Sequence, residues 1–347
     1  MTLTTTPVRF KVTLARAALN TATLLACMSF GQAAFAQGKG IDDPFRAGYK
    51  STLAGKTVAF VPVAMGFDLA QGWFEGLKKE LEPLGVKVIS RDPNWNTNVG
   101  AQAITSLISE KPDVIVVHNP DVQTYAKLLQ RAEEAGIQVV QVNMRSNYSS
   151  VVYVGVDWVD IGEKATTAVV QACKGKSNKV AIVQGALSAA ASAYTLQGVE
   201  NVLAKNPDIK VVSSQASDWD AAKAKGITQT VLKQHPDLCG IVGFWDGHDS
   251  GTAAAIKEAG LTGKVFLATS GGGEQKGACD QVKSGAFDLD LSYDVPTQAS
   301  NMASSIKWLL QNKGKTGTAK GSIYTTIIPI TKANASIEGT CWKLGKG

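Results

Sequence analysis

Short runs of Val and Ile alternate along the chain with longer stretches in which apolar residues recur at helical spacing. The runs predicted to be β-strands are residues 57–63, 86–90, 114–118, 138–142, 179–184, 210–215, 240–244, 264–268 and 288–291. The stretches predicted to be helices are residues 73–84, 99–110, 122–135, 161–173, 194–205, 221–234, 250–259 and 297–311. Strands that alternate with helices in this way are typical of parallel β-sheets.

The strand–helix units form two similar sets, one before and one after residue 150, without a Pro- or Ser-rich linker between them. We therefore predict an α/β fold of two similar parallel-sheet lobes, joined by a hinge of three chain crossings. The crossings are expected at residues 153–158, 292–296 and 322–328. The expected lobes are residues 37–155 with 295–325, and residues 156–294 with 326–347.

The N-terminal segment, residues 1–36, has the features of a secretory signal peptide. Basic residues precede a largely apolar run over residues 17–30, and Ala34-Phe35-Ala36 follows as a cleavage site. Because the run is too short to span a membrane, cleavage and export to the periplasm are expected. The alternative is a lipoprotein that carries its lipid on Cys27.

The net charge of the chain bears on whether it binds nucleic acid. There are 35 Lys and Arg residues against 29 Asp and Glu residues, a net charge of +6. Three of the cations belong to the leader, so the remainder has a charge of 32 − 29 = +3. A nearly neutral body with scattered lysines argues against a nucleic-acid partner.

Cysteine content bears on the redox state and on metal binding. Cys173, Cys239, Cys279 and Cys341 remain after cleavage, an even number in an oxidising compartment. Their pairing is open at this stage, and buried free thiols are the alternative. We expect Cys279 to pair with Cys341 in the second lobe, which would hold the C-terminal tail. No C-x-x-C or Cys/His cluster occurs, so neither a metal nor another cofactor is expected.

Trp, Asn and Asp residues are concentrated in the loops that follow the predicted strands. These loops are residues 66–68, 71–74, 92–96, 118–121, 143–145, 185–192, 217–220, 244–249, 269–274 and 293–294. In open α/β sheets ligands bind beyond the carboxyl ends of the strands. Aromatic rings pack on the apolar faces of sugars, and Asn, Asp and Arg bind hydroxyl groups, so a small polyhydroxylated ligand is predicted. The alternative is that the acids and amides cap helices while each Trp covers the edge of a core.

The sequence offers no catalytic set. Gly271-Gly272-Gly273 completes no phosphate-binding pattern, and the three histidines are far apart. Asp246, His248 and Asp249 could be offered as an acid–base or metal group, but N-capping of the following helix explains them more simply. We therefore expect a binding protein and not an enzyme.

Several stretches resemble a known family, the type I periplasmic solute-binding proteins of the ribose-binding class, which are the receptors of sugar ABC importers. The resemblance covers residues 56–332, and its most specific parts are residues 71–78, 154–157, 216–224 and 235–237. It implies a monomer that captures its ligand between two closing lobes and delivers it to a membrane permease and its ATPase. A periplasmic sensor that presents a small ligand to a chemoreceptor or histidine kinase is the alternative.

The resemblance also implies ligand-binding positions. Those of the first lobe are Gln71, Trp73, Phe74, Asn143 and Arg145; those of the second are Trp219, Trp245, Asp246, Ser270 and Asp294. Trp73 and Trp219 are predicted to clamp opposite faces of the ligand. Asn143 stands where the family has Asp, and Trp245 where it has Asn, which disfavours ribose because buried hydroxyls would lose partners. A less polar polyol, such as a sugar alcohol or deoxy sugar, is expected, with a quaternary ammonium compound second.

Overall fold

The computed structural model describes residues 44–312 and 319–345, so the predicted signal peptide and Cys27 lie outside the described residues. Residues up to Gly48 and residues from Tyr49 onward form two separate units, and the architecture below is that of the second. Helix α1 spans Pro44–Leu53.

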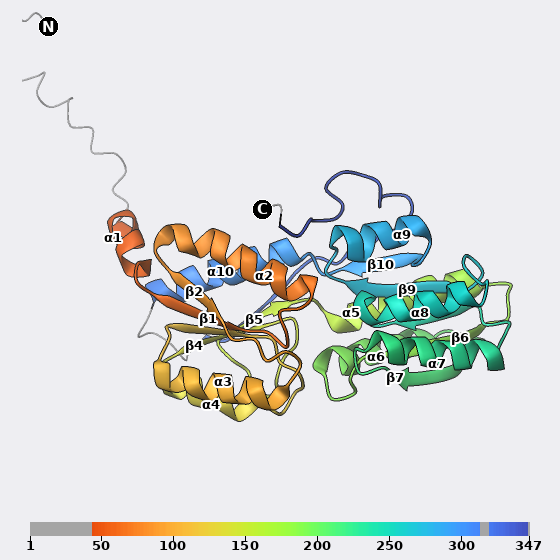
Figure 1. The fold of residues 1–347 in the computed structure, drawn as a ribbon, viewed down its shortest axis with the longest axis horizontal. Helices are drawn as coiled ribbons and strands as arrows, with labels where there is room; N and C mark the ends of the chain where they lie inside the picture. Colours follow the sequence, from red (N-terminus) through yellow and green to blue (C-terminus); the bar gives the residue numbers. More distant parts are fainter. Residues whose placement is uncertain (1–43, 313–318, 346–347) are drawn as a thin grey trace, which may run out of the picture. The chain divides into compact units, whose positions relative to one another are not determined.

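The first lobe is built on a six-stranded parallel sheet (Figure 1). Its strands, in spatial order, are β2 (Lys87–Ser90), β1 (Thr57–Val61), β3 (Val114–Val117), β4 (Gln138–Val142), β5 (Val152–Gly155) and β11 (Gly321–Tyr324). All of the pairings are parallel. The carboxyl ends of these strands therefore lie along one edge of the sheet.

The second lobe repeats this order in another six-stranded sheet. Its strands are β7 (Lys210–Ala216), β6 (Lys179–Gln184), β8 (Gly240–Gly243), β9 (Phe266–Gly271), β10 (Leu289–Ser292) and β12 (Ile328–Ile330). All are parallel except β12, which pairs antiparallel with β10. β1 to β5 thus correspond in order to β6 to β10.

Helices cover both faces of each sheet. The first sheet is packed by α2 (Asp68–Leu81) and α10 (Val295–Gln311) on one face and by α3 (Thr97–Glu110) and α4 (Ala126–Glu134) on the other. The second is packed by α5 (Trp158–Cys173) and α6 (Ala190–Leu203), and by α7 (Ala221–Gln234) and α8 (Asp246–Glu258) opposite them. The remaining helices are short: η1 (Glu82–Leu84), η2 (Gln275–Cys279) and α9 (Asp280–Ser284).

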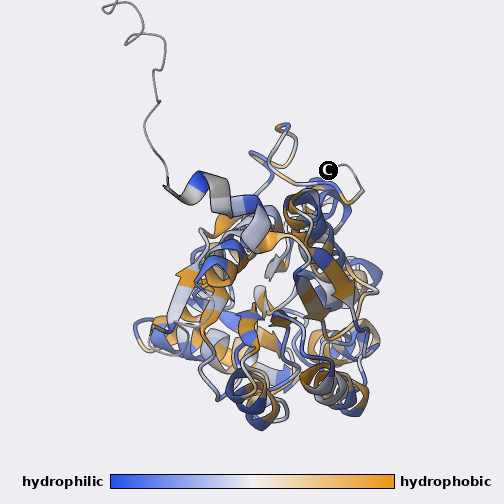
Figure 2. Cartoon of the chain, turned by 90° about the vertical axis from the view of Figure 1, so that its left-hand side faces the viewer, coloured by the Kyte–Doolittle hydropathy of each residue, from blue (hydrophilic) through white to orange (hydrophobic). Residues whose placement is uncertain are grey.

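The core follows from the two-residue repeat of the strands. Val58 and Phe60 point to the cluster beneath α2 and α10, whereas Ala59 and Val61 point to the cluster beneath α3 and α4. Both faces of a strand are thus apolar, which explains the uninterrupted Val and Ile runs. Figure 2 shows hydrophobic residues along the central strands and hydrophilic residues along the outer helix surfaces.

The chain passes between the two sheets after β5, after β10 and after β11. The predicted fold class, two similar parallel-sheet lobes joined by three crossings, is confirmed. β5, β11 and β12 were not predicted as strands; β11 and β12 follow one another without a helix between them, outside the strand–helix alternation. None of the helices in the described ranges is long and apolar enough to cross a membrane.

Two disulfide bonds lie in the second lobe. Cys279 is bonded to Cys341, as expected, and Cys173 is bonded to Cys239. The first of these bonds holds the C-terminal tail, where the Trp342 indole nitrogen donates a hydrogen bond to the carbonyl of Gly272. The alternative of buried free thiols is wrong.

Candidate functional site

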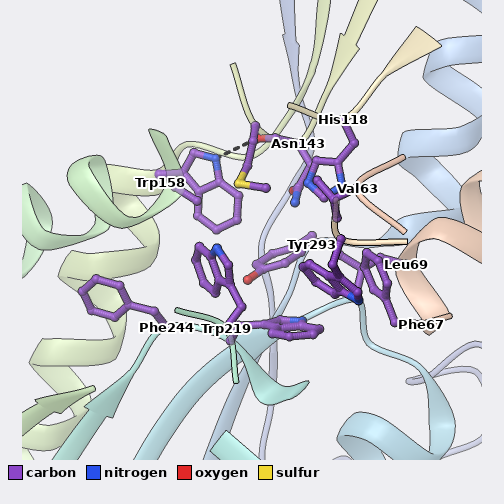
Figure 3. A pocket seen from close by; sticks show the side chains of 13 residues that line it. Val63, Phe67, Leu69, His118, Asn143, Trp158, Trp219, Phe244 and Tyr293 are labelled. Atoms are coloured by element: carbon purple, nitrogen blue, oxygen red, sulfur yellow. Dashed lines mark hydrogen bonds between the residues drawn. The ribbon is translucent and has the colours of Figure 1, made fainter. Parts of the chain in front are cut away.

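An aromatic cavity lies at the carboxyl ends of the strands of both sheets (Figure 3). This inner chamber has a volume of about 40 Å³. Its walls are formed by Val63, Phe67, Leu69, Trp95, His118, Asn143, Met144, Trp158, Ala191, Trp219, Phe244, Trp245 and Tyr293. An outer chamber of about 210 Å³ shares Val63, Trp95, Met144 and Trp219 with it, so the two chambers form one cleft.

Trp95 and Trp219 enter the cleft from equivalent loops of the two lobes. Trp95 follows β2 and Trp219 follows β7, and each stands between two Asn or Asp residues. Both backbones are left-handed, with φ of 64° at Trp95 and 65° at Trp219. Bulky residues rarely adopt this conformation, which is strained and tends to occur at functional sites.

Trp245 links these two side chains at the end of β8. Its ring centroid lies 6.4 Å from that of Trp95 and 6.3 Å from that of Trp219. Phe67 of the first lobe meets Trp245 of the second at 5.7 Å and 76°. The rings of Phe67 and Trp219 therefore both stand steeply on Trp245, and the three enclose one side of the cleft.

Trp158 and Tyr293 form another part of the wall. Their ring centroids lie 5.0 Å apart at 72°. The indole nitrogen of Trp158 donates to the main-chain carbonyl of Asn143 at 2.9 Å, which fixes the ring in place. The Tyr293 hydroxyl lies 2.6 Å from the Ser270 hydroxyl, so Ser270 orients a wall residue from behind.

The polar side chains of the inner chamber are His118 and Asn143. Both are buried, and the two ring nitrogens of His118 and Oδ1 of Asn143 have no hydrogen-bond partner within the described part of the chain. Burial lowers the pKa of His118 to about 3, so its ring is neutral near pH 7. Asn143 is a third wall residue with a left-handed backbone, at φ 61°.

Buried carboxyl groups lie behind Tyr293. Burial, followed by the neighbouring carboxyl of Asp290, raises the pKa of Asp246 well above its usual range. Burial likewise raises the pKa of Asp290, next to Asp68 and Asp249. Burial raises the pKa of Asp68 to about 6. No group of three or more His, Cys, Asp or Glu side chains in the described ranges is placed to hold a metal ion.

The family model of the periplasmic binding protein domain matches residues 58–315 of this chain. The match covers more than half of the chain. The chain belongs to this family. The resemblance inferred from the sequence is therefore confirmed.

The relatives of this chain include proteins that bind a sugar and a polyol. The ribose import binding protein RbsB of Bacillus subtilis is 26% identical over 54% of this chain and 60% of its own length. The xylitol-binding protein of Mycolicibacterium smegmatis is 26% identical over 61% of this chain, again 60% of its own length. The chain thus spans about three fifths of these relatives.

Solved structures share the fold. A solute-binding protein of an ABC transporter from Burkholderia graminis, in complex with D-arabinose, superposes with a TM-score of 0.74 at 25% identity. The superposition covers 82% of this chain and 98% of the solved chain. A galactofuranose-binding protein superposes with a TM-score of 0.73 at 20% identity, over 81% and 96% of the two chains. These structures share the two-lobed architecture.

Asn143, Trp219 and Trp245 are the predicted site residues that line the cavity. Trp73 does not line it. Trp73 is fully buried beneath α10, where its indole nitrogen donates to Gln298 at 2.9 Å. The first lobe instead presents Trp95, so the structure gives no support to a clamp that uses Trp73.

The other predicted site residues also lie outside the cavity wall. Gln71 donates to the carbonyl of Met65, and Phe74 stacks on Phe60. Arg145 stacks on Tyr153 at 3.9 Å and donates to Tyr324. Asp294 accepts a hydrogen bond from the backbone nitrogen of Thr297, which caps α10.

Asp246 and its neighbours do not cap α8, so that interpretation is wrong. Trp245 is the N-cap residue and makes no side-chain cap hydrogen bond. Asp246 Oδ2 has no partner in the described chain, and Asp249 accepts hydrogen bonds from Thr252 and Thr269. The cause is that Asp246, His248 and Asp249 are all buried within the fold.

Phe67, Trp95, His118 and Tyr293 lie in strand-end loops that were expected to surround the ligand, but they were not named as binding positions, and Trp158 lies outside those loops. A signal for Trp95 was present, because Asn94-Trp95-Asn96 after one strand repeats Asp218-Trp219-Asp220 after its counterpart. His118 ends a predicted strand and stands far from the other histidines, so it carries no ligand-binding pattern. Nothing in the sequence pattern distinguishes the inward-facing ring of Trp158.

Proposed function

We propose that this protein is the solute-binding component of a sugar ABC importer, and that it captures a small carbohydrate or polyol between its lobes. The observation that carries the proposal is the set of aromatic rings that both lobes present at the carboxyl ends of their parallel strands. Such rings pack on the apolar faces of sugars. Ligands of open α/β sheets bind at these ends.

The relatives support a role in import over a role as a sensor. Their names describe a ribose import binding protein and a xylitol-binding protein. The partners of this protein would then be a membrane permease and its ATPase, and it would act in the periplasm as a monomer without catalytic activity. The family of periplasmic binding proteins supports this location.

The two lobes close on the ligand by a hinge at the three connections. In this proposal the lobes are residues 37–155 with 295–325 and residues 156–294 with 326–347. Contacts of a closed form are present: the backbone nitrogen of Val122 donates to the carbonyl of Ser188 at 3.1 Å across the cleft. Phe67 and Trp245 also meet across it. Ligand binding would stabilise this closed arrangement.

A thermal-shift screen tests the proposal. The mature protein is heated with pentoses, hexoses and sugar alcohols, and a ligand at 100 times its Kd should stabilise it by about 2.7 kcal/mol. Trp245→Ala should abolish the shift, whereas Trp308→Ala should preserve it, because Trp308 is exposed and does not line the cleft. If no sugar or polyol shifts the melting temperature, the proposed function is wrong.

A further inference from the structure

Most polar side chains of the outer chamber are already engaged. The carboxylate of Asp121 accepts hydrogen bonds from the backbone nitrogens of Gln123 and Thr124. The side chain of Asn96 caps α3, and the hydroxyl of Tyr125 donates to a backbone carbonyl. These bonds fix the orientations of the three side chains, and the amide nitrogen of Asn96 is left as a donor.

The inner chamber has one polar corner. As far as the chain is described, no Asp, Glu, Lys or Arg lines it, and its remaining wall is aromatic or aliphatic. His118 is 3% exposed and Asn143 is 5% exposed, and both carry polar atoms without a partner among the described residues. A neutral imidazole has one donor and one acceptor, so His118 can bind two hydroxyl groups. Leaving such atoms unpaired in a buried site is unfavourable, and this corner is therefore where the polar part of a ligand would be bound.

Burial limits the negative charge that two of the neighbouring acids bring to the chamber. Asp246 and Asp290 lie behind Tyr293, and burial favours the uncharged forms of both carboxyl groups. An aromatic enclosure attracts cations through the quadrupoles of its rings, so the rings alone do not exclude a quaternary ammonium ligand. The donor and acceptor atoms of His118 and Asn143 that lack partners favour a ligand with hydroxyl groups, because a quaternary ammonium group cannot form hydrogen bonds with them.

We infer that the ligand is an uncharged ring compound with broad apolar faces, of the class of deoxy sugars, whose few hydroxyl groups lie along one edge, where His118 and Asn143 bind them. This inference rests on the proposed function, because it concerns the same cleft. A fully hydroxylated sugar would place further hydroxyl groups against these rings, whose indole N–H groups can donate a hydrogen bond but cannot accept one, and each hydroxyl left without an acceptor lowers affinity.

Isothermal titration of matched sugars tests the ligand class. The pairs are L-fucose with L-galactose and L-rhamnose with L-mannose, in which a methyl group replaces a hydroxymethyl group. The deoxy member should bind about tenfold or more tightly in at least one pair, because a single unpaired buried hydroxyl has an effect of this size. Tighter binding of the hydroxylated member in every pair would overturn the inference and leave the proposed function standing. A higher affinity for choline than for its neutral isostere 3,3-dimethylbutan-1-ol would overturn the inference that the ligand is uncharged. Binding of no sugar and no polyol would refute the proposed function itself.

Substitution tests the role of His118. His118→Phe keeps a ring of similar size and removes both hydrogen-bonding atoms, so affinity for the best deoxy sugar should fall about tenfold or more while the melting temperature of the free protein is maintained or raised. His118→Gln should recover part of the affinity. His235→Phe is the matched control, because His235 lies outside the cleft, and it should change nothing. Unchanged affinity in His118→Phe and His118→Gln would show that His118 only fills space.

Discussion

Gly185 offers a way to displace Trp219 without changing any side chain that lines the inner chamber. A Cβ atom at Gly185 would lie 2.0 Å from Cη2 and 2.1 Å from Cζ3 of the Trp219 indole. Ordinary carbon contacts begin near 3.4–3.5 Å, so Gly185→Ala should move the ring by about 1.4 Å or more. The indole is held face-on by His248 at 5.7 Å and edge-on by Trp245 at 6.3 Å, so the shift disturbs the wall it forms.

The loss of affinity expected for Gly185→Ala can be compared with that for complete removal of the Trp219 ring. Trp219→Ala should cost on the order of 2–4 kcal/mol of binding, the range of strong aromatic anchors. Gly185→Ala should lower the affinity for the sugar about tenfold or more, because a displaced indole ring loses contact with the ligand. Isothermal titration with the tightest-binding sugar of the screen gives both numbers, and calorimetric melting of the free proteins gives their stabilities.

The matched control is Gly226→Ala, whose added Cβ has no atom within 4 Å. Because Gly226 lies inside α7, this substitution should stabilise the protein by about 0.5–1 kcal/mol and leave affinity unchanged. The idea would fail if both Gly185→Ala and Trp219→Ala kept wild-type affinity while Trp219→Ala lowered the melting temperature by several degrees. Trp219 would then have only a structural role.

Three further outcomes are expected. Asp290→Asn should raise the free energy of unfolding at pH 8 and have little effect near pH 4. Because the pKa of Asp290 is raised in the folded protein, folding takes up a proton above the unfolded pKa of about 3.9. The stability of the wild-type protein therefore falls as the pH rises above that value. Equal effects at the two pH values in urea titrations would contradict this. Cys341→Ser should lower the free energy of unfolding by about 4 kcal/mol, the chain-entropy value for a disulfide that closes a loop of 62 residues. An unchanged free energy of unfolding would refute this expectation. Arg145→Ala should change sugar affinity by less than about twofold, because Arg145 stacks on Tyr153 outside the cavity, and a larger loss in titration would restore its predicted role in binding.

The sheets could be predicted from the sequence because their strands are covered on both faces. An uninterrupted run of Val and Ile such as residues 114–117 is too short for a buried helix and is typical of a strand between two layers of helices. β11 gave no such signal, since all of its residues are exposed at the edge of the sheet. β12 is a short Ile-Pro-Ile segment that pairs antiparallel with β10, and its place depends on the chain returning to the second lobe.

The predicted site residues that line the cavity, Asn143, Trp219 and Trp245, each follow a strand, whereas the prediction for Trp73 failed because a helix boundary was misplaced. α2 begins at Asp68, five residues before the predicted start. Leu69, Trp73, Leu77 and Leu81 therefore form one buried stripe at helical spacing, and Trp73 belongs to the core. Arg145 lies only two residues beyond Asn143, but its guanidinium stacks on Tyr153 and donates to Tyr324 instead of lining the cavity.

The repeated motif around Trp95 and Trp219 explains why both lobes contribute to one site. Asn94 and Asp218 adopt positive φ at low cost because short polar side chains tolerate this region. Asn96 and Asp220 cap the helices that follow, accepting hydrogen bonds from their first turns. The cap and the turn together hold each intervening Trp in a strained conformation that costs on the order of 1–3 kcal/mol. Such strain persists only where the surrounding structure fixes the backbone, and here it occurs twice, once in each lobe, at the two faces of one cleft. The strained turns thus direct both indoles into the cleft, and a ligand that binds there would have less side-chain motion to order.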